Sequence, residues 1–218
     1  MGGRGAKSGI KPLDKSAKSG IIGIGSDGAL EQAKTRDKKI IITDMAIEKA
    51  EAPDIPYFTP EQNKKFKELN KEVLRKSMNE NDSNEVAFLF NPHTLSYEYE
   101  FGNTFNVNIF NNPLARDMNR NAKEKDLFLI HNHPSTKNFS YTDIGTLLLN
   151  DNIGGMTAVA NNGVVNTIYK TPRYDFNRAF SLISDIRSKY PEKLSDKDDI
   201  AIVKQFLKGS KNCGIESL

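Results

Sequence analysis

The chain has 218 residues, a net charge of +3, 37% hydrophobic and 27% charged residues, and no Trp. This length allows one domain with extensions, or two small domains. The single cysteine, Cys213, excludes a disulfide framework within one chain, so a reducing compartment is expected. The net charge is too small to indicate a nucleic-acid partner by itself. No apolar stretch has the length that spans a bilayer, so we expect no membrane partner.

The first 18 residues are basic and rich in glycine. They carry five Lys or Arg side chains against one acidic side chain. This composition predicts a solvated, disordered arm, with a contact to nucleic acid or to a capsid as the alternative. Residues 1–55 are expected to form this arm and a linker punctuated by prolines. A short strand at Ile40–Thr43, followed by one or two helical turns, could interrupt them.

The next segment predicts an amphipathic helix. In TPEQNKKFKELNKEVLRKSM, Thr59 is a natural N-cap, Pro60 takes the first helical position and Gln62 completes a capping box. Apolar side chains follow at helical spacing, so one face of this helix should be buried.

Several runs of strand character come next. Residues 85–91 are apolar almost throughout, whereas residues 95–101 and 105–110 alternate between apolar and polar side chains. Asn and Gly separate these runs, as in a meander of antiparallel strands. Residues 113–125 predict an amphipathic helix, and residues 126–130 are apolar on both faces, which is typical of a central strand.

The remaining elements complete the predicted fold. Ser140 opens a helix with Asp143 three positions later, which is another capping-box pattern. Residues 156–170 predict a hairpin with an Asn-Asn-Gly turn. Two amphipathic helices, roughly 174–189 and 195–208, close the chain. Together these elements predict an α/β fold with a mixed, mainly antiparallel sheet flanked by helices.

Two of the three histidines stand at the end of the predicted central strand, in LFLIHNHPSTKNFSYTD. Residues i and i+2 of a strand share a face, so His131 and His133 should project side by side, with Asn132 turned away. Pro134 cannot continue a central ladder, so both imidazoles should lie where the strand ends. Asp143 should return close to them, because nine residues separate it from His133.

Two imidazoles and a carboxylate suit Zn²⁺, and three protein ligands leave a fourth position for water, as in catalytic zinc sites. Glu85, which leads the first apolar strand, is the candidate proton acceptor. Glu98 and Glu100 are rivals, but their alternating strand favours exposure to solvent. Ser140 could donate a hydrogen bond to the oxyanion of a tetrahedral intermediate, although an N-cap uses the same hydroxyl. We expect His93 to be a turn residue.

The order of these residues resembles a known signature. A Glu, then His-x-His-Pro, then Ser-x-x-Asp, over roughly residues 84–170, is similar to the JAMM (MPN or JAB) metalloprotease superfamily, and HNHPS is most similar to its RadC-like branch. The resemblance implies the JAB/MPN fold, with cytidine-deaminase-like layering. In that family two His and the Asp hold Zn²⁺, the Glu activates water and the Ser assists the tetrahedral intermediate. Those roles would fall on His131, His133, Asp143, Glu85 and Ser140.

One spacing departs from the family. The segment between His133 and Asp143 is one residue shorter than usual, so the helix would begin one residue earlier. With this departure, the resemblance implies a JAMM/MPN-like metal-binding domain at residues 56–172, including its leading helix. Residues 1–55 would then be the arm and linker, and residues 173–218 a C-terminal helical extension.

The implied activity is a zinc-dependent hydrolase that cleaves a peptide or isopeptide bond in a protein or peptide substrate. The flanking sequence resembles proteins of phages and mobile elements, which implies a bacterial or phage-infected cytoplasm, or association with a virion. Two alternatives stay open. One is a non-catalytic or DNA-associated RadC-like binding module, and the other is a toxin or effector that uses the same site. A two-metal nuclease needs more carboxylates than the sequence places here.

Overall fold

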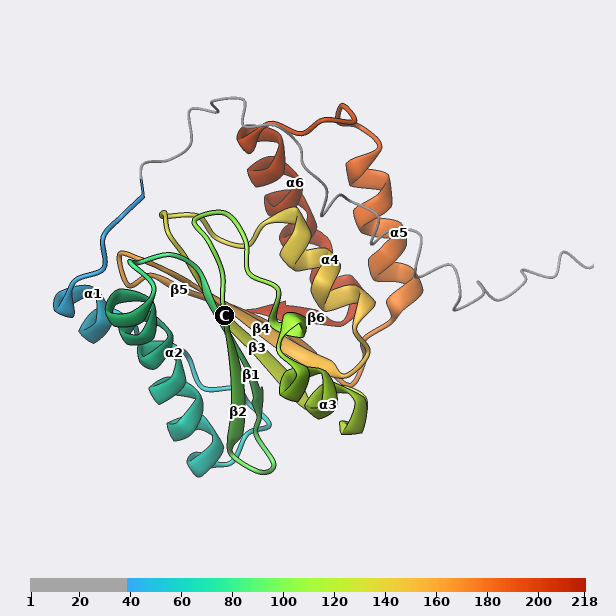
Figure 1. The fold of residues 1–218 in the computed structure, drawn as a ribbon. Helices are drawn as coiled ribbons and strands as arrows, with labels where there is room; N and C mark the ends of the chain where they lie inside the picture. The colour runs from blue at the N-terminus through green and yellow to red at the C-terminus, as the bar shows by residue number, and fades with distance from the viewer. Residues whose placement is uncertain (1–38) are drawn as a thin grey trace, which may run out of the picture. The chain divides into compact units, whose positions relative to one another are not determined.

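The structure is a computed structural model and describes residues 39–218. These residues form a six-stranded sheet with the strand order β2-β1-β3-β4-β5-β6 (Figure 1). The strands are β1 (Val86–Asn91), β2 (Ser96–Phe101), β3 (Leu127–His133), β4 (Ile153–Ala160), β5 (Val165–Lys170) and β6 (Ile215–Ser217). The α-helices are α1 (Asp44–Lys49), α2 (Pro60–Glu80), α3 (Pro113–Asn121), α4 (Tyr141–Leu149), α5 (Phe176–Arg187) and α6 (Asp196–Gly209). Two 3₁₀ helices are η2 (Ile109–Asn111) and η3 (Ser210–Cys213).

Strand β3 lies inside the sheet, between β1 and β4. It pairs with β1 antiparallel and with β4 parallel, and α4 provides the crossover from β3 to β4. The other neighbours, β1 with β2, β4 with β5, and β5 with β6, are all antiparallel. An α/β chain with a mixed, mainly antiparallel sheet flanked by helices is therefore confirmed.

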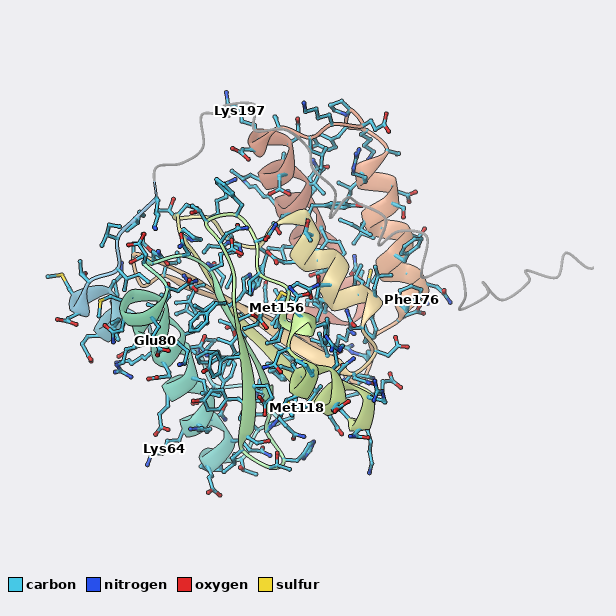
Figure 2. The ribbon with its side chains drawn as sticks, in the orientation of Figure 1. Lys64, Glu80, Met118, Met156, Phe176 and Lys197 are labelled. Carbon is cyan, nitrogen blue, oxygen red and sulfur yellow. The ribbon has the colours of Figure 1, made fainter. Side chains whose placement is uncertain are left out.

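The helices cover both faces of the sheet. Figure 1 shows α1 and α2 on one side and α3 to α6 on the other. Each side has its own apolar cluster: Phe66, Phe88 and Phe128 lie on the side of α2, and Met156 lies with Phe206 on the other side. Exposed side chains of α2, such as Lys64 and Glu80, and the core residue Met156 are labelled in Figure 2.

Local sequence signals explain the helices that position the site. Thr59 and Gln62 form the expected capping box of α2, with Pro60 in its first turn. Ser140 and Asp143 form the same box at α4. The hairpin of β4 and β5 turns at Asn161-Asn162-Gly163, where Gly163 has a φ of 84°. The two C-terminal helices are also where the pattern predicts them.

Two expected strands are absent. Residues 105–110 form a loop and the start of η2, because Asn side chains take over the backbone amides that a strand would pair. Asn103 Oδ1 accepts from the amides of Phe105 and Asn106, and Asn108 caps η2. The segment Ile40–Thr43 is likewise no strand, although the one or two helical turns predicted after it are present as α1.

The segments before residue 56 and after residue 172 both pack against the central part of the fold. Residues 39–55 bury apolar side chains against α2, and residues 173–218 contribute α5, α6 and β6 to the same sheet and cluster as β3. The proposed boundaries at 55 and 172 stay a prediction, and the basic arm lies outside the described residues. None of the helices within residues 39–218 combines the length and apolar character that a bilayer crossing requires.

Candidate metal centre

Strand β3 delivers two imidazoles to one face. Its odd-numbered apolar residues, Leu127 and Leu129, pack in the cluster on the side of α4, whereas Phe128 and Ile130 pack towards α2. By the same alternation, the two histidines share the α4 side and Asn132 faces α2. His131 is 3% exposed and His133 is 8% exposed. The distance between their Nε2 atoms is 2.9 Å.

Helix α4 delivers the third group. Asp143 Oδ1 lies 3.4 Å from His131 Nε2, and Asp143 Oδ2 lies 3.4 Å from His133 Nε2. The capping box holds the carboxylate in place, because Oδ2 accepts hydrogen bonds from the amide and the hydroxyl of Ser140 at 2.6 and 2.7 Å. The Asp143 side chain is 17% exposed, so the cluster reaches the surface on this side.

The charges and hydrogen bonds within the cluster shift the pKa values of Asp143 and His133. Burial favours the neutral form of Asp143, but the charges and hydrogen bonds of the two imidazoles outweigh it and hold the pKa of Asp143 well below its usual range. Burial also disfavours the charged ring of His133. The hydrogen bond and charge of Asp143, together with the charge of Glu85, overcome it and raise the pKa of His133 to about 9. In the metal-free chain this is a site of attraction between a cationic ring and a carboxylate.

The arrangement could hold a divalent metal ion. One ligand atom from each of His131, His133 and Asp143 lies within 4.8 Å of the others, and no fourth His, Cys, Asp or Glu of residues 39–218 joins this group. A tetrahedral ion with bonds of about 2.0–2.1 Å places its ligand atoms about 3.3–3.4 Å apart. The two nitrogen-to-oxygen distances of 3.4 Å match this spacing, and the nitrogen pair at 2.9 Å needs a small separation.

Contacts outside the cluster hold His133 and the end of β3 in place. The ring of His133 donates a hydrogen bond to the backbone of Lys137, and its Nε2 faces the cluster. Pro134 O accepts from the amide of Ile40 at 2.7 Å, which ties the end of β3 to the segment before α1. Nδ1 of His131 is buried and has no hydrogen-bond partner among the described residues.

Asn132 anchors the opposite side of β3. Its Oδ1 accepts from the amide of Val86 at 2.7 Å, and its Nδ2 donates to Ser77 Oγ, Asn84 O and Asn161 Oδ1. The Val86 contact fixes the start of β1 beside the end of β3.

Glu85 stands at that start and is 8% exposed. Its carboxylate is not a member of the three-residue group, but its negative charge contributes to the raised pKa of His133. Glu98 and Glu100 lie on β2, partly exposed and outside the group. The structure thus brings four predicted site residues into direct contact, and sets Glu85 close enough to influence one of them. His93 lies in an exposed turn and pairs with Asp126.

The sequence did not show which residues contact the segment between His133 and Asp143. Asp196 and Asp199 contact the segment that joins the histidines to Asp143, and Lys137 within that segment contacts the ring of His133. Ser195 and Asp198 form a capping box at the start of α6, but nothing in the sequence placed α6 against a segment nearly sixty positions earlier.

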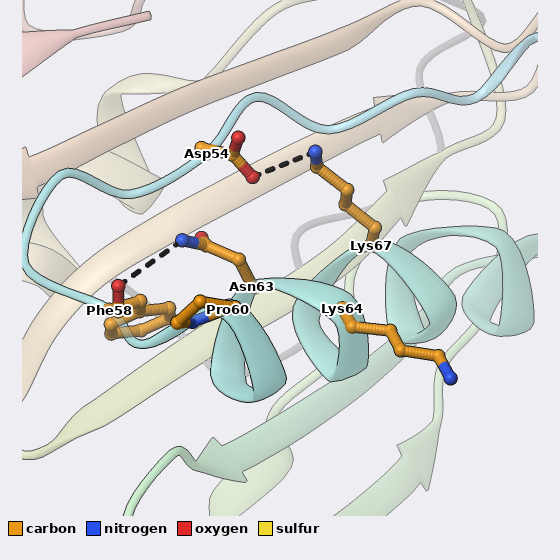
Figure 3. A pocket seen from close by; sticks show the side chains of 6 residues that line it. All are labelled: Asp54, Phe58, Pro60, Asn63, Lys64 and Lys67. Atoms are coloured by element: carbon orange, nitrogen blue, oxygen red, sulfur yellow. Dashed lines mark hydrogen bonds and ion pairs between the residues drawn. The ribbon is translucent and has the colours of Figure 1, made fainter.

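Two surface hollows lie away from the cluster. One, of about 210 Å³, is lined by residues that include Pro92 and Asp126, which flank the other ends of β1 and β3. Seven residues of strand separate Asp126 from Pro134, which is about 26 Å. The other hollow, shown in Figure 3, lies at the N-terminal end of α2, where Lys67 pairs with Asp54 at 2.7 Å. Neither hollow is lined by His131, His133 or Asp143.

Comparisons of the chain with models of known families, with curated proteins and with solved structures gave no match.

Proposed function

We propose that this chain is a zinc-dependent hydrolase that cleaves a peptide or isopeptide bond. The observation that carries the proposal is the convergence of His131, His133 and Asp143 at the end of a central strand, with one side partly open. Three protein ligands from nitrogen and oxygen donors, without a fourth from residues 39–218, are typical of catalytic zinc. The proposal includes membership of the JAMM superfamily, in its RadC-like branch, and the JAB/MPN layering of the sheet.

Zinc held by these ligands supplies a Lewis acid that makes water nucleophilic near neutral pH. Glu85 takes the proton of the attacking water and passes it to the leaving amine. Its low exposure keeps solvent from competing for that proton. Ser140 stabilises the oxyanion only when its hydroxyl leaves Asp143, because that hydroxyl already donates to the carboxylate.

The first test measures metal and cleavage in the same sample. Full-length protein purified without chelator is analysed for zinc, then incubated with a randomised peptide mixture and with Lys-linked isopeptides, and new amines are detected by mass spectrometry. We expect about one zinc per chain and cleavage that stops when a chelator removes it. Much less than stoichiometric zinc would contradict the proposal.

Glu85→Gln tests the assignment of the proton carrier. The variant should keep its zinc, since Glu85 is not in the ligand group, and lose about 10²–10⁴-fold in hydrolysis rate. Glu98→Gln is the matched control, because it makes the same chemical change on β2 and should leave the rate unchanged. Equal rates for Glu85→Gln and the wild type would show that another group carries the proton.

A further inference from the structure

We propose that α6 positions the metal ligands through Asp196 and Asp199. This inference rests on the proposed metal centre and extends it to the C-terminal helices. Both acids lie in the first turn of α6. Their partners lie in the segment between His133 and Asp143, so α6 is joined by side chains to the stretch that connects the ligands.

The first contact holds the helix that carries Asp143. Asp199 Oδ1 accepts a hydrogen bond from the amide of Tyr141 at 2.8 Å. Tyr141 begins α4, and its amide is one of the four that a helix leaves without an internal partner. Ser140 already caps the amide of Asp143. The first turn of α4 is thus capped twice, once from within and once by an acid of another helix.

The second contact holds the loop behind His133. Lys137 Nζ lies 3.1 Å from Asp196 Oδ1, and both side chains are only partly exposed. The backbone of the same lysine accepts the hydrogen bond from the ring of His133. A displacement of Lys137 would therefore release the partner that orients this imidazole.

Helix α6 is itself packed in the apolar core. Further along the same face, the helix buries Ile202, Val203 and Phe206 in the apolar cluster that also contains Ile144 of α4. Residues 134–140 have no regular structure of their own. Their position is set at one end by the contact of Pro134 with the segment before α1, and at the other end by the two acids of α6.

The test compares Asp199→Ala with Asp199→Asn in the full-length protein. Zinc affinity is measured by competition with a chelating indicator, and the visible spectrum of the Co²⁺-loaded protein reports the coordination geometry. Removal of a partner outside the ligand set typically weakens metal binding about 10–100-fold, and we expect this loss with a changed Co²⁺ spectrum for Asp199→Ala. Asp199→Asn keeps an acceptor for the Tyr141 amide and should restore most of the affinity and the spectrum.

Asp198→Asn is the matched control. Asp198 lies beside Asp199 and accepts hydrogen bonds from the amide and the hydroxyl of Ser195, the N-cap of α6. The variant therefore removes the same charge and weakens the same helix, but it changes no contact with the segment between His133 and Asp143. It should bind zinc as the wild type does. The pair Asp196→Asn and Lys137→Met, measured singly and together, should show a non-additive effect on zinc affinity.

Amide hydrogen exchange in metal-free protein separates this inference from the proposed function. Asp199→Ala should speed exchange at Tyr141 and Asp143, and Asp198→Asn should not. If the wild type binds neither metal, the proposed function fails, and the exchange rates still decide whether α6 holds the loop. Zinc affinity and exchange within twofold of the wild type for Asp199→Ala would overturn the inference, as would equal losses for Asp198→Asn.

Discussion

The hydroxyl of Ser140 makes two hydrogen bonds within its own helix. It donates to Asp143 Oδ2 at 2.7 Å and accepts from the Asp143 amide at 3.1 Å. Ser195 makes the same pair of bonds with Asp198 at the start of α6, at 2.6 and 3.2 Å. The N-cap role predicted for Ser140 is therefore confirmed, and its role in catalysis stays a prediction. The two serines form a natural comparison, because only the cap of α4 includes a proposed metal ligand, Asp143.

Ser140→Ala and Ser195→Ala should each cost about 1 kcal/mol of unfolding free energy, which is the usual effect of a lost N-cap. Only Ser140→Ala should also weaken zinc binding, because it removes a hydrogen bond that orients the Asp143 carboxylate. Urea denaturation of the metal-free protein gives the first quantity and indicator competition the second. Equal zinc affinities in the two variants would show that the cap does not orient the ligand.

The raised pKa of His133 predicts how zinc binding depends on pH. The ring is protonated below about pH 9 in the metal-free chain, so each bound ion must displace a proton. Asp143 stays ionised over this range. The apparent zinc affinity should rise about tenfold per pH unit from about pH 6.5 to about pH 8.5. An affinity that does not change over this range would mean that His133 is neutral or is not a ligand.

The raised pKa of His133 makes the stability of the metal-free fold change with pH in the opposite direction, so that stability falls as the pH rises. A raised pKa stabilises the folded state fully below the ordinary histidine value near 6.5. This contribution is lost as the pH rises through about 9.

At the level of elements, Asn132 links four parts of the fold. Its amide group joins the end of β3 to α2, to the start of β1 and to the turn between β4 and β5. The side chain is fully buried. The sequence placed Asn132 on the face opposite the histidines, but it did not show whether the side chain had a structural task. That answer depends on partners from distant segments.

Asn132→Ala should lower the unfolding free energy by about 3 kcal/mol or more, because it leaves the Val86 amide buried without a partner. Thr157→Val is the contrasting variant. Its hydroxyl is buried in β4 and has no partner among the described residues, so its removal should be neutral or stabilising. Urea denaturation of both variants checks the contrast. A mild effect of Asn132→Ala would mean that water replaces its hydrogen bonds.

Elements with strong local signals are the ones that the sequence predicts well. The helices α2 and α4 begin at capping boxes, and β3 is marked by apolar residues on both faces. The run at 105–110 has strand alternation, but its asparagines satisfy nearby amides and bend the chain into η2. The alternation of apolar and polar residues indicates which side chains can be buried. It does not reveal that asparagine side chains will accept hydrogen bonds from backbone amides and so replace strand pairing.

For the molecule as a whole, the sheet is what brings the site together. Glu85 and His131 lie 46 positions apart, yet β1 pairs with β3 so that Ala87 is opposite His131. The proposed ligands His133 and Asp143 lie close in the sequence, and their convergence follows from a strand end and a helix start. For this reason their convergence could be predicted from spacing. The support from α6 could not, because tertiary packing alone places Asp199 beside Tyr141.

A crystal structure of the full-length protein grown with zinc, with an anomalous difference map at the zinc edge, tests the central claim most directly. We predict one peak bonded by Nε2 of His131, Nε2 of His133 and a carboxylate oxygen of Asp143, with a non-protein ligand in the fourth position beside Glu85. A map without a peak between these three side chains would contradict the account. A fourth protein side chain on the ion would also contradict it, because the site would then be closed and structural.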